Sequence, residues 1–450
     1  MEPLLPIVYV AAHGGYHPER HPLGGGAAVC RRLVQLWGAD PRISLTLLAP
    51  AEKPPDFPPT VGYVRLSVLK GNLHPAQLTQ REYAAFCRGF EAAATKCLER
   101  LTKESPSKRF AVLSNDIAEG IDFRRASALG LPVVTLFHVD VADIFSRLYL
   151  GCKGPPVPAV RLFSSLEALG LCGLCPDVLR LVFEKQAQCV RHSARLVVPS
   201  EEMARTLARC YGEGVRRKTA VLPWGGWEEA VSEQEVEAEV AKARREFDLG
   251  PETTVLLTLS RISPEKGTDL LLKALLSWER QAASSSRDNR PETRLEDLRV
   301  LICGSAAFMG GEAFARKLQR LASKLRRIRV SFPGHVGGPR KRALFRLANL
   351  YVFPSRHESY GLTLVEALRQ GVPALTSACH GARHLVRPAY GRVVNLDRCG
   401  PRRLLDALRT LLADRERLAS MKEEARRAGR EMDFSRAASN LRDLIAATLA

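Results

Sequence analysis

Two glutamates stand at either end of one stretch that combines a predicted strand, a loop and a predicted helix. The apolar run Leu350–Phe353 is typical of a buried parallel strand, and a polar loop that contains Glu358 follows it. Gly361 is expected to open a helix that contains Glu366, eight positions after Glu358. Unpaired N–H groups at the start of a helix form an anion site. We therefore predict a bound diphosphate between two carboxylates, with Glu366 one turn along and able to accept from a ribose diol. The alternative is a pair of ordinary solvated glutamates.

Two cations occur upstream in a similar setting. Arg261 and Lys266 follow the predicted strand Thr254–Leu259, and Pro264 bends the loop between them. Two cations that converge beyond a strand end suit a diphosphate, whose negative charge they would neutralise. The alternative is an Arg and a Lys on an ordinary surface loop.

These stretches carry a resemblance to a known family. HESYGLTLVEAL resembles the Glu-x7-Glu motif of retaining glycosyltransferases of glycosyltransferase family 4, which have the GT-B fold, and LTLSRISPEKGTDLLLKAL resembles a second motif of that family. The resemblance is strong over 254–371 and weaker in the first half. It implies transfer of a hexose from a nucleotide diphosphate sugar to a hydroxyl of a glycan, a lipid or a small molecule, with retention at the anomeric carbon. It also implies no metal and no cofactor beyond the nucleotide sugar.

The resemblance assigns roles to particular residues. Arg261 and Lys266 would stabilise the leaving diphosphate, Glu358 would hold sugar hydroxyls, and His138 would lie on the other side of the transferred sugar. The predicted donor-binding residues, besides Arg261, Lys266 and Glu358, are Gly25, Gly26, Gly304, His335, Val336, Tyr360, Gly361, Leu362, Thr363 and Glu366.

The amino-terminal half supplies weaker candidates. His138 follows the predicted strand Pro132–Phe137, and a lone His in this place is more often structural. Because polar groups at the carboxyl ends of parallel strands face the ligand crevice, four residues are candidates for holding an acceptor. They are Asn115, Asp116, Glu119 and Asp140.

Three further features of this half bear on the site. Gly24–Gly26 precede a predicted helix and allow a close approach to the backbone, but the run is not a dinucleotide-binding GxGxxG. Trp224 stands where the family commonly has Asn-Gly, which puts in doubt a side-chain contact with the donor at this point. The segment Tyr149–Cys175 reads as irregular and rich in Pro and Gly, with no role assigned.

Length and alternation of strands with helices predict the architecture. The 450 residues suffice for two cores. The resemblance implies an α/β GT-B protein with two Rossmann-like, doubly wound parallel-sheet domains facing a deep interdomain cleft. The predicted domains are 1–228 for the acceptor, 229–430 for the nucleotide-sugar donor, and a closing helix, 431–450, that returns to the first domain. Residues 281–297 read as a polar linker.

Composition narrows the class of partner. The net charge is +19, yet no nucleic-acid motif is present, and much of the charge falls on amphipathic helices. Contact with an anionic membrane is one possible use of this charge. The amino-terminus reads as a strand and not a signal peptide, so we predict a cytoplasmic protein that associates with the inner face of the membrane if at all.

Cysteine usage favours reduced thiols. The 11 Cys are scattered, and Cys172 and Cys175 lack the second ligand pair that a zinc site requires.

Three rival functions remain open. A sugar-nucleotide epimerase or a glycan phosphorylase can share the GT-B fold, although a phosphorylase needs a Schiff-base lysine that we cannot identify. A catalytically silent nucleotide-sugar binding protein is the third. The sugar, the nucleotide, the acceptor and the oligomeric state have no signature in the sequence.

Overall fold

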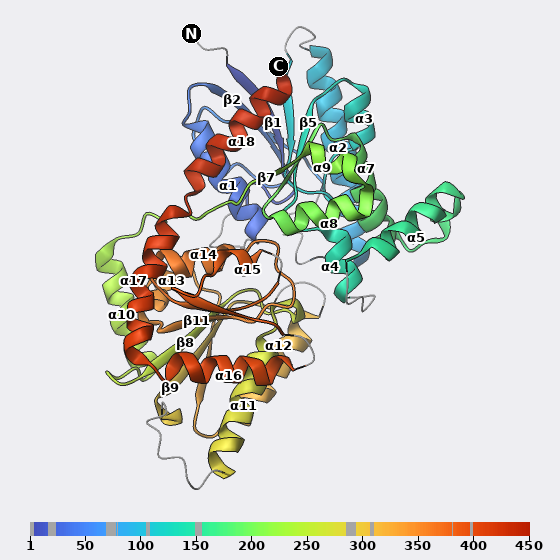
Figure 1. Cartoon of the computed structure of the whole chain (residues 1–450). Helices are drawn as coiled ribbons and strands as arrows, with labels where there is room; N and C mark the ends of the chain where they lie inside the picture. The colour runs from blue at the N-terminus through green and yellow to red at the C-terminus, as the bar shows by residue number, and fades with distance from the viewer. Residues whose placement is uncertain are drawn as a thin grey trace. The chain divides into compact units, whose positions relative to one another are not determined.

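The computed structural model divides the chain into two compact units, Met1–Trp224 with Ser435–Ala450, and Gly225–Phe434. Figure 1 shows the ribbon of the chain, coloured by residue number from the N-terminus to the C-terminus. The structure describes residues 4–16, 24–68, 78, 80–104, 109–148, 155–284, 294–306, 310–379, 381–396 and 399–450. Residues 285–293 of the predicted linker lie outside these ranges.

The first unit is built on a parallel sheet of seven strands in the order β3-β2-β1-β4-β5-β6-β7. The strands are β1 (Leu5–Val10), β2 (Ile43–Ala49), β3 (Gly62–Arg65), β4 (Ala111–Ser114), β5 (Val133–Leu136), β6 (Arg195–Val198) and β7 (Thr219–Val221). β4 and β5 are buried along their whole length, because helices cover a parallel sheet on both faces.

Helices connect these strands. They are α1 (Gly25–Gly38), α2 (Gln80–Glu104), α3 (Phe123–Ala128), α4 (Val141–Leu148), α5 (Val157–Ala168), η2 (Leu171–Leu174), α6 (Asp177–Leu179), η3 (Arg180–Glu184), α7 (Lys185–His192), α8 (Glu201–Tyr211) and α9 (Glu213–Lys218). Ser200 caps α8 as predicted, since its side chain accepts from the N–H of Met203.

The last helix, α18 (Phe434–Leu449), belongs almost entirely to the first unit. Its residues Leu441 and Ile445 are fully buried. Arg442 of the same helix lies 3.6 Å from Asp40, which follows the end of α1.

The second unit is built on a parallel sheet of six strands in the order β10-β9-β8-β11-β12-β13. The strands are β8 (Thr254–Leu259), β9 (Leu298–Cys303), β10 (Arg329–Gly334), β11 (Leu350–Phe353), β12 (Ala374–Ser377) and β13 (Gly391–Val394). Two parallel sheets with connecting helices make each unit Rossmann-like, as predicted.

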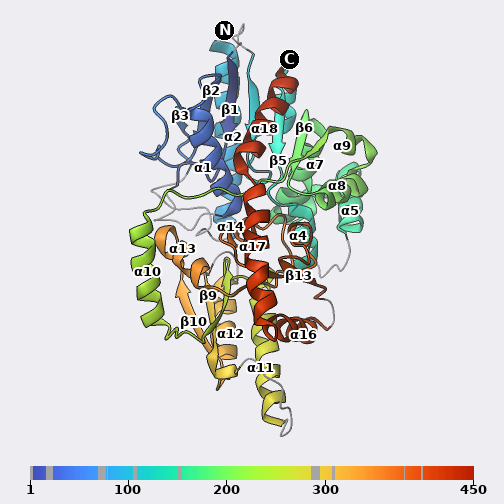
Figure 2. The ribbon, with the colours of Figure 1, turned by 60° about the vertical axis from the view of Figure 1, so that its left-hand side comes forward.

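The helices of the second unit include the one that begins after Gly361. They are α10 (Glu233–Glu246), η4 (Pro264–Lys266), α11 (Thr268–Ser284), η5 (Leu295–Asp297), α12 (Gly311–Ala322), α13 (Gly338–Leu347), α14 (Leu362–Arg369), α15 (Ala382–Leu385), α16 (Gly400–Leu412) and α17 (Arg415–Glu431). α10 and α13 lie side by side (Figure 2), joined by ion pairs such as Arg346 with Glu237 at 2.6 Å.

The expectation that Tyr149–Cys175 is irregular is wrong for most of its described part. Pro156 and Pro158 stand at the start of α5, where proline is tolerated, and the chain continues into η2. Phe163 stacks on Phe183 with ring centroids 5.5 Å apart, which anchors one face of α5. The Pro- and Gly-rich composition therefore marks the ends of helices.

Two other findings complete the fold. The ten cysteines that the structure describes are all free thiols. Within the described ranges, no helix combines the length and the apolar character that crossing a membrane would require.

Candidate active site

The predicted anion site has the local structure that the sequence indicated. β11 is fully buried, and its chain leads through the loop to Gly361, which precedes α14 with a left-handed φ of 98°. Gly361 is thus the residue before the helix and not its first residue. Among the residues described, no side chain caps this end, so the N–H groups of the first turn, from Leu362 and Thr363 onward, are available to a ligand.

Glu358 and Lys266 form an ion pair beside this turn. The Lys266 Nζ lies 2.7 Å from Glu358 Oε2, and the two side chains are only 12% and 15% exposed. Burial alone would raise the pKa of Glu358, but the charges of Lys266, His357 and Arg261 outweigh it and lower that pKa. The carboxylate therefore stays ionised inside the protein.

Close backbone packing holds Lys266 in place. Gly267 has a φ of 65°, and a Cβ there would lie 2.0 Å from the carbonyl oxygen of Pro354, at the end of β11. The N–H of Arg356 donates to Glu265 O at 2.7 Å. Arg261 lies 3.8 Å from Glu265, so both predicted cations belong to one loop packed against the end of β11.

Glu366 pairs with a lysine that the sequence did not single out. Lys341 Nζ on α13 lies 3.2 Å from Glu366 Oε1 and 2.8 Å from Glu229. Burial and the neighbouring Glu229 raise the pKa of Glu366, against the opposing charge of Lys341. Within the described residues the Glu366 Oε2 atom is buried without a hydrogen-bond partner, so it is available to accept from a hydroxyl group.

The remaining donor-side residues occupy neighbouring loops. Gly304 donates to Gly334 O at 2.7 Å, which joins the ends of β9 and β10. A Cβ on Gly304 would lie 1.8 Å from Ser260 O, so only glycine fits there. His335 is only partly covered by its neighbours, and this partial burial of its ring together with the nearby charge of Lys341 lowers its pKa. Val336 is buried.

Tyr360 and Thr363 have structural bonds of their own. The Tyr360 hydroxyl accepts from Gly225 N at 2.7 Å, and Thr363 Oγ1 lies 2.9 Å from the hydroxyl of Tyr351. Their side chains therefore shape the loop and the helix start. Donor binding by their backbone remains a prediction.

In the first unit, His138 is part of a hydrogen-bonded group. Its Nε2 lies 3.1 Å from Asn115 Oδ1, which also accepts from the Tyr9 hydroxyl at 2.6 Å. Because an amide oxygen only accepts, Nε2 carries the proton and Nδ1 is left as an acceptor. Burial, aided by the nearby His13, lowers the pKa of His138 to about 3, so the ring is neutral.

Gly26 and Trp224 shape the surroundings of His138. A Cβ on Gly26 would lie 2.9 Å from His138 Cδ2, so α1, which begins at Gly25, can approach the ring only with glycine at that position. The ring of Trp224 lies beside the imidazole, with centroids 5.5 Å apart. Trp224 thus packs beside His138, a predicted site residue. This contact gives a structural reason for a bulky side chain where the family commonly has Asn-Gly.

Asp116 and Glu119 form a second group with two residues that the sequence analysis missed. His13 Nε2 lies 3.4 Å from Glu119 Oε1, and the Tyr83 hydroxyl donates to the same carboxylate. Burial, partly offset by His13, raises the pKa of Asp116 to about 6. One ligand atom each from His13, Asp116 and Glu119 lie within 4.8 Å of one another, a grouping that could hold a metal ion. His13 directly follows a strand end in HGG, which was the available signal.

Asp140 is used differently. Its Oδ1 accepts from the N–H of Asp143 at 3.0 Å, at the start of α4, and from Gln186 Nε2 at 3.0 Å. The side chain is buried, and these bonds favour a structural role over the predicted contact with an acceptor.

Comparison with known proteins supports the chemistry of the second unit. Residues 239–428 match the family described as glycosyl transferases group 1. The match falls inside the unit that contains Lys266, Glu358 and Glu366, and it supports glycosyl transfer.

Curated relatives are bacterial enzymes. The chain is 33% identical over 238 residues to a D-inositol 3-phosphate glycosyltransferase of Geodermatophilus obscurus, which covers 52% of this chain and 49% of the relative. It is 28% identical over 305 residues to the enzyme of the same name from Xylanimonas cellulosilytica, covering 66% and 68%. The chain thus spans about half the length of the first of these relatives.

Solved structures share the fold over the whole chain. Sucrose-phosphate synthase from Thermosynechococcus elongatus superposes with a TM-score of 0.67 at 16% identity, covering 98% of this chain and 100% of that one. The Anabaena protein HepE, crystallised with UDP and glucose, gives a TM-score of 0.63 at 15% identity, covering 98% and 99%. At such identities the likeness shows the two-domain Rossmann-like fold alone.

Proposed function

We propose that this protein is a retaining glycosyltransferase of glycosyltransferase family 4 that moves a hexose from a nucleotide diphosphate sugar to a hydroxyl group of a glycan, a lipid or a small molecule. The observation that carries this is the buried ion pair of Lys266 and Glu358 beside the uncapped start of α14. Glu366, with a buried oxygen that has no hydrogen-bond partner among the described residues, lies one turn into that helix. The Glu-x7-Glu spacing thus corresponds to two carboxylates in different electrostatic settings.

The charges suggest how the reaction proceeds. As the bond between the anomeric carbon and the diphosphate oxygen breaks, negative charge grows on the leaving group, and Lys266, Arg261 and the first N–H groups of α14 stabilise it. The acceptor oxygen forms the new bond to the same carbon, and its proton passes to the oxygen of the leaving diphosphate. Glu358 orients sugar hydroxyls, Glu366 accepts from the ribose, and the neutral His138 offers Nδ1 to a hydroxyl. Because side-chain cations and a helix terminus can supply the positive charge, we propose that transfer requires no metal ion.

The rivals predict different products. An epimerase would convert the donor sugar with no acceptor present. A silent binding protein would hold a nucleotide sugar and release no nucleoside diphosphate. A phosphorylase would need a lysine free for a Schiff base, whereas Lys266 is ion-paired with Glu358.

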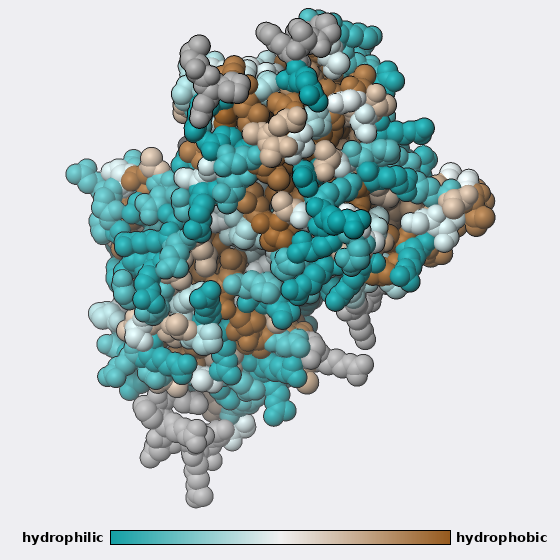
Figure 3. Space-filling view, turned by 45° about the horizontal axis from the view of Figure 1, so that its top comes forward, coloured by the Kyte–Doolittle hydropathy of each residue, from teal (hydrophilic) through white to brown (hydrophobic). Residues whose placement is uncertain are grey.

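A second part of the proposal concerns the surface at which the enzyme meets its acceptor. Within the described ranges, four of the six exposed large hydrophobic side chains lie on α5 and η2 or directly after α5: Leu162, Leu169, Leu171 and Leu174. Figure 3 shows this hydrophobic tip at the right-hand edge of the molecule. Arg161 lies on α5, and Arg180, which pairs with Glu184, begins η3. Apolar side chains flanked by cations suit an anionic bilayer, so we propose a cytoplasmic enzyme that docks this tip on the inner face of the membrane.

The transferase proposal is tested by incubating the purified protein with a panel of nucleotide diphosphate sugars and candidate acceptors. Released nucleoside diphosphate and the anomeric configuration of the product, read by NMR, are the measurements. We expect turnover with retention, and a loss of about 100-fold or more in Lys266→Ala, since a charge that stabilises the transition state is removed. Lys273→Ala, which removes an exposed lysine of α11, is the matched control. An inverted product, or equal rates in both variants, would contradict the proposal.

A further inference from the structure

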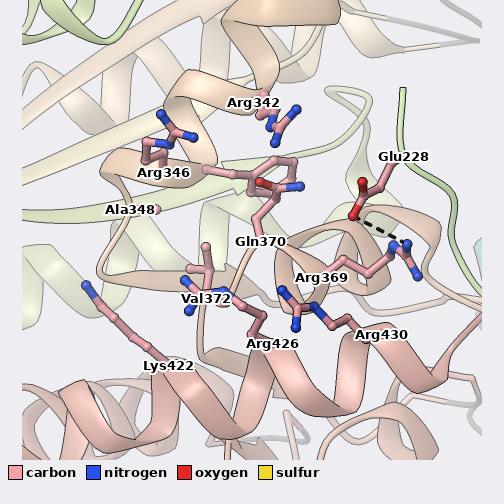
Figure 4. A pocket seen from close by; sticks show the side chains of 12 residues that line it. Glu228, Arg342, Arg346, Ala348, Arg369, Gln370, Val372, Lys422, Arg426 and Arg430 are labelled. Atoms are coloured by element: carbon pink, nitrogen blue, oxygen red, sulfur yellow. Dashed lines mark ion pairs between the residues drawn. The ribbon is translucent and has the colours of Figure 1, made fainter. Parts of the chain in front are cut away.

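A second cation-rich cavity lies in the second unit, outside the predicted donor site. It has a volume of about 280 Å³ and is lined by residues of α13, α14 and α17 and by the chain that follows α14. None of Arg261, Lys266, Glu358 and Glu366 is among its lining residues. Figure 4 shows Lys422, Arg426 and Arg430 rising from α17 on one side, with Arg342 and Arg346 of α13 opposite. The function proposed above makes no use of this cavity.

The charges around this cavity are unbalanced. Six cationic side chains line it, and Glu228 is the one carboxylate among the lining residues described. The cations are Arg342, Arg346, Arg369, Lys422, Arg426 and Arg430. Lys422, Arg426 and Arg430 are spaced four residues apart, so they share one face of α17. Like charges at this spacing destabilise a helix, so the arrangement has an energetic cost.

Neighbouring carboxylates compensate only part of this charge. Arg346 pairs with Glu233 and Glu237, and Arg342 lies 3.6 Å from Glu233. Arg426 pairs with Glu423 at 2.8 Å, and Arg369 lies 3.7 Å from Glu228. For Lys422 and Arg430, no carboxylate within ion-pair distance is recorded among the described residues. Burial and the nearby charge of Arg426 lower the pKa of Lys422.

Unused hydrogen-bond donors point the same way. The Nε atoms of Arg342 and Arg369 are buried and have no hydrogen-bond partner in the described part of the chain. Buried donors without partners are uncommon in folded proteins, and a binding site for an ion or ligand is one explanation for them. The cavity therefore combines excess positive charge with unsatisfied donors.

Two glycines allow these cations to gather. Gly371, with a φ of 74°, lies so close to Arg426 that a Cβ would be 3.0 Å from its Nη2. Gly429 lets α17 approach α14, since a Cβ there would lie 2.4 Å from the backbone nitrogen of Arg369. The backbone therefore brings guanidinium groups from two helices to one cavity.

We propose that this cavity binds a small anion that carries at least two phosphate-type negative charges, held between the α17 cations and those of α13 and α14. Planar guanidinium groups bind phosphate oxygens in pairs, and an anion between the walls relieves the repulsion along α17. The volume suits a compact group of this kind. The proposal is independent of glycosyl transfer, and either can fail without the other.

Inorganic pyrophosphate is the probe, titrated by calorimetry into Lys266→Ala protein so that the donor site contributes little. We expect saturable binding that weakens at least 10-fold when Lys422→Ser and Arg426→Ser are added, because charged hydrogen bonds are lost. The matched control adds Arg415→Ser and Arg427→Ser, two exposed cations of the same helix, and so changes the net charge equally. Equal affinity of the two triple variants would overturn the proposal.

Thermal unfolding provides a second readout. Without an anion, removing Lys422 and Arg426 should leave the melting temperature unchanged or raise it, because repulsion is relieved. Pyrophosphate should raise the melting temperature of the control variant but not that of the cavity variant. A fall in melting temperature without anion, combined with an equal pyrophosphate response, would assign these cations a purely structural role.

The phosphate groups could belong to a soluble metabolite or to a lipid headgroup. Cosedimentation with phosphatidylcholine vesicles that contain phosphatidic acid, with and without pyrophosphate as competitor, separates the two. Vesicle binding that depends on Lys422 and Arg426 assigns the headgroup. Pyrophosphate binding without such vesicle binding assigns the soluble source.

Discussion

Glu358 and Glu366 carry the same chemical group, yet their surroundings shift the pKa of each in opposite directions. Lys266 and its neighbours lower the pKa of Glu358, whereas burial and Glu229 raise the pKa of Glu366. A permanently ionised carboxylate suits strong hydrogen bonds to sugar hydroxyls. A carboxylate with one oxygen paired and the other unpartnered suits a single defined hydroxyl.

The first residue-scale prediction concerns that hydroxyl. Compared with the normal nucleotide sugar, a donor analogue without the ribose 2′-hydroxyl should lower kcat/KM of the wild type by about 10-fold or more, because a buried acceptor is left unpaired. In Glu366→Ala, kcat/KM for the normal donor should already be lower by this factor. The values of kcat/KM for the normal donor and the analogue should then differ little in this variant. Steady-state kinetics on both donors is the measurement, with Glu423→Ala on α17 as the control. A full response to the analogue in Glu366→Ala would contradict the assignment.

The second residue-scale prediction concerns pH. The native pKa of Asp116 is about 6, above its ordinary value of 3.8, so the folded state binds more protons than the unfolded chain between these values. The contribution of Asp116 to the free energy of unfolding should therefore fall as pH rises from about 4 to 6 and stay low above that. Asp116→Asn should remove this component in urea titrations from pH 4 to 7. Asp443→Asn, at an exposed site, should not change it; the same pH profile in wild type and Asp116→Asn would refute the assignment.

The residue scale also shows what the sequence could and could not reveal. Arg261, Lys266, Glu358 and Glu366 could be found because each follows a recognisable strand end or lies in a motif. Lys341 and Tyr83 could not, because neither lies in a motif or after a predicted strand end, and each meets its carboxylate partner only in the folded chain. His13 had a signal in HGG, but its contact with Glu119, 106 residues away, could not be read from the sequence. Asp140 was placed correctly after its strand, but its capping bond to α4 depends on a helix that we did not predict.

At the scale of elements, continuous apolar runs were the most informative signals. The predicted bounds of the strands Thr254–Leu259 and Leu350–Phe353 are those of β8 and β11. The prediction failed at α5, where Pro and Gly were taken as signs of irregular structure. Prolines at the start of α5 and Gly170 with a φ of 70° at its end are instead the boundaries of a helix.

The element-scale prediction concerns the membrane tip. Replacing Leu169 and Leu174, 70% and 83% exposed, by serine should weaken binding to vesicles containing anionic phosphatidylglycerol by about 10-fold or more, because two apolar side chains no longer enter the bilayer. Leu4→Ser, at an exposed leucine elsewhere in the unit, is the control. Cosedimentation is the measurement. If the serine variant binds vesicles as the control does, or only loses self-association in analytical ultracentrifugation, the tip has another partner.

At the scale of the whole molecule, net charge is the property that acts over distance. A charge of +19 attracts a dianionic nucleotide sugar, and salt screens this attraction beyond about 10 Å at 0.1 M. The KM for the donor should therefore rise several-fold between about 50 and 500 mM NaCl. The KM for an uncharged acceptor is the internal control and should change little. Parallel changes in both would mean that salt acts on the fold.

The order of the segments has a consequence for biosynthesis. Because α18 belongs to the first unit, while Gly225–Phe434 form the other unit, the first unit lacks this helix until residues 435–450 have been synthesised. The unit Gly225–Phe434 is therefore synthesised in full before the first unit can bury Leu441 and Ile445 of α18. A nascent chain that stalls near residue 434 would thus expose an apolar groove to chaperones, however well its second half had already matured.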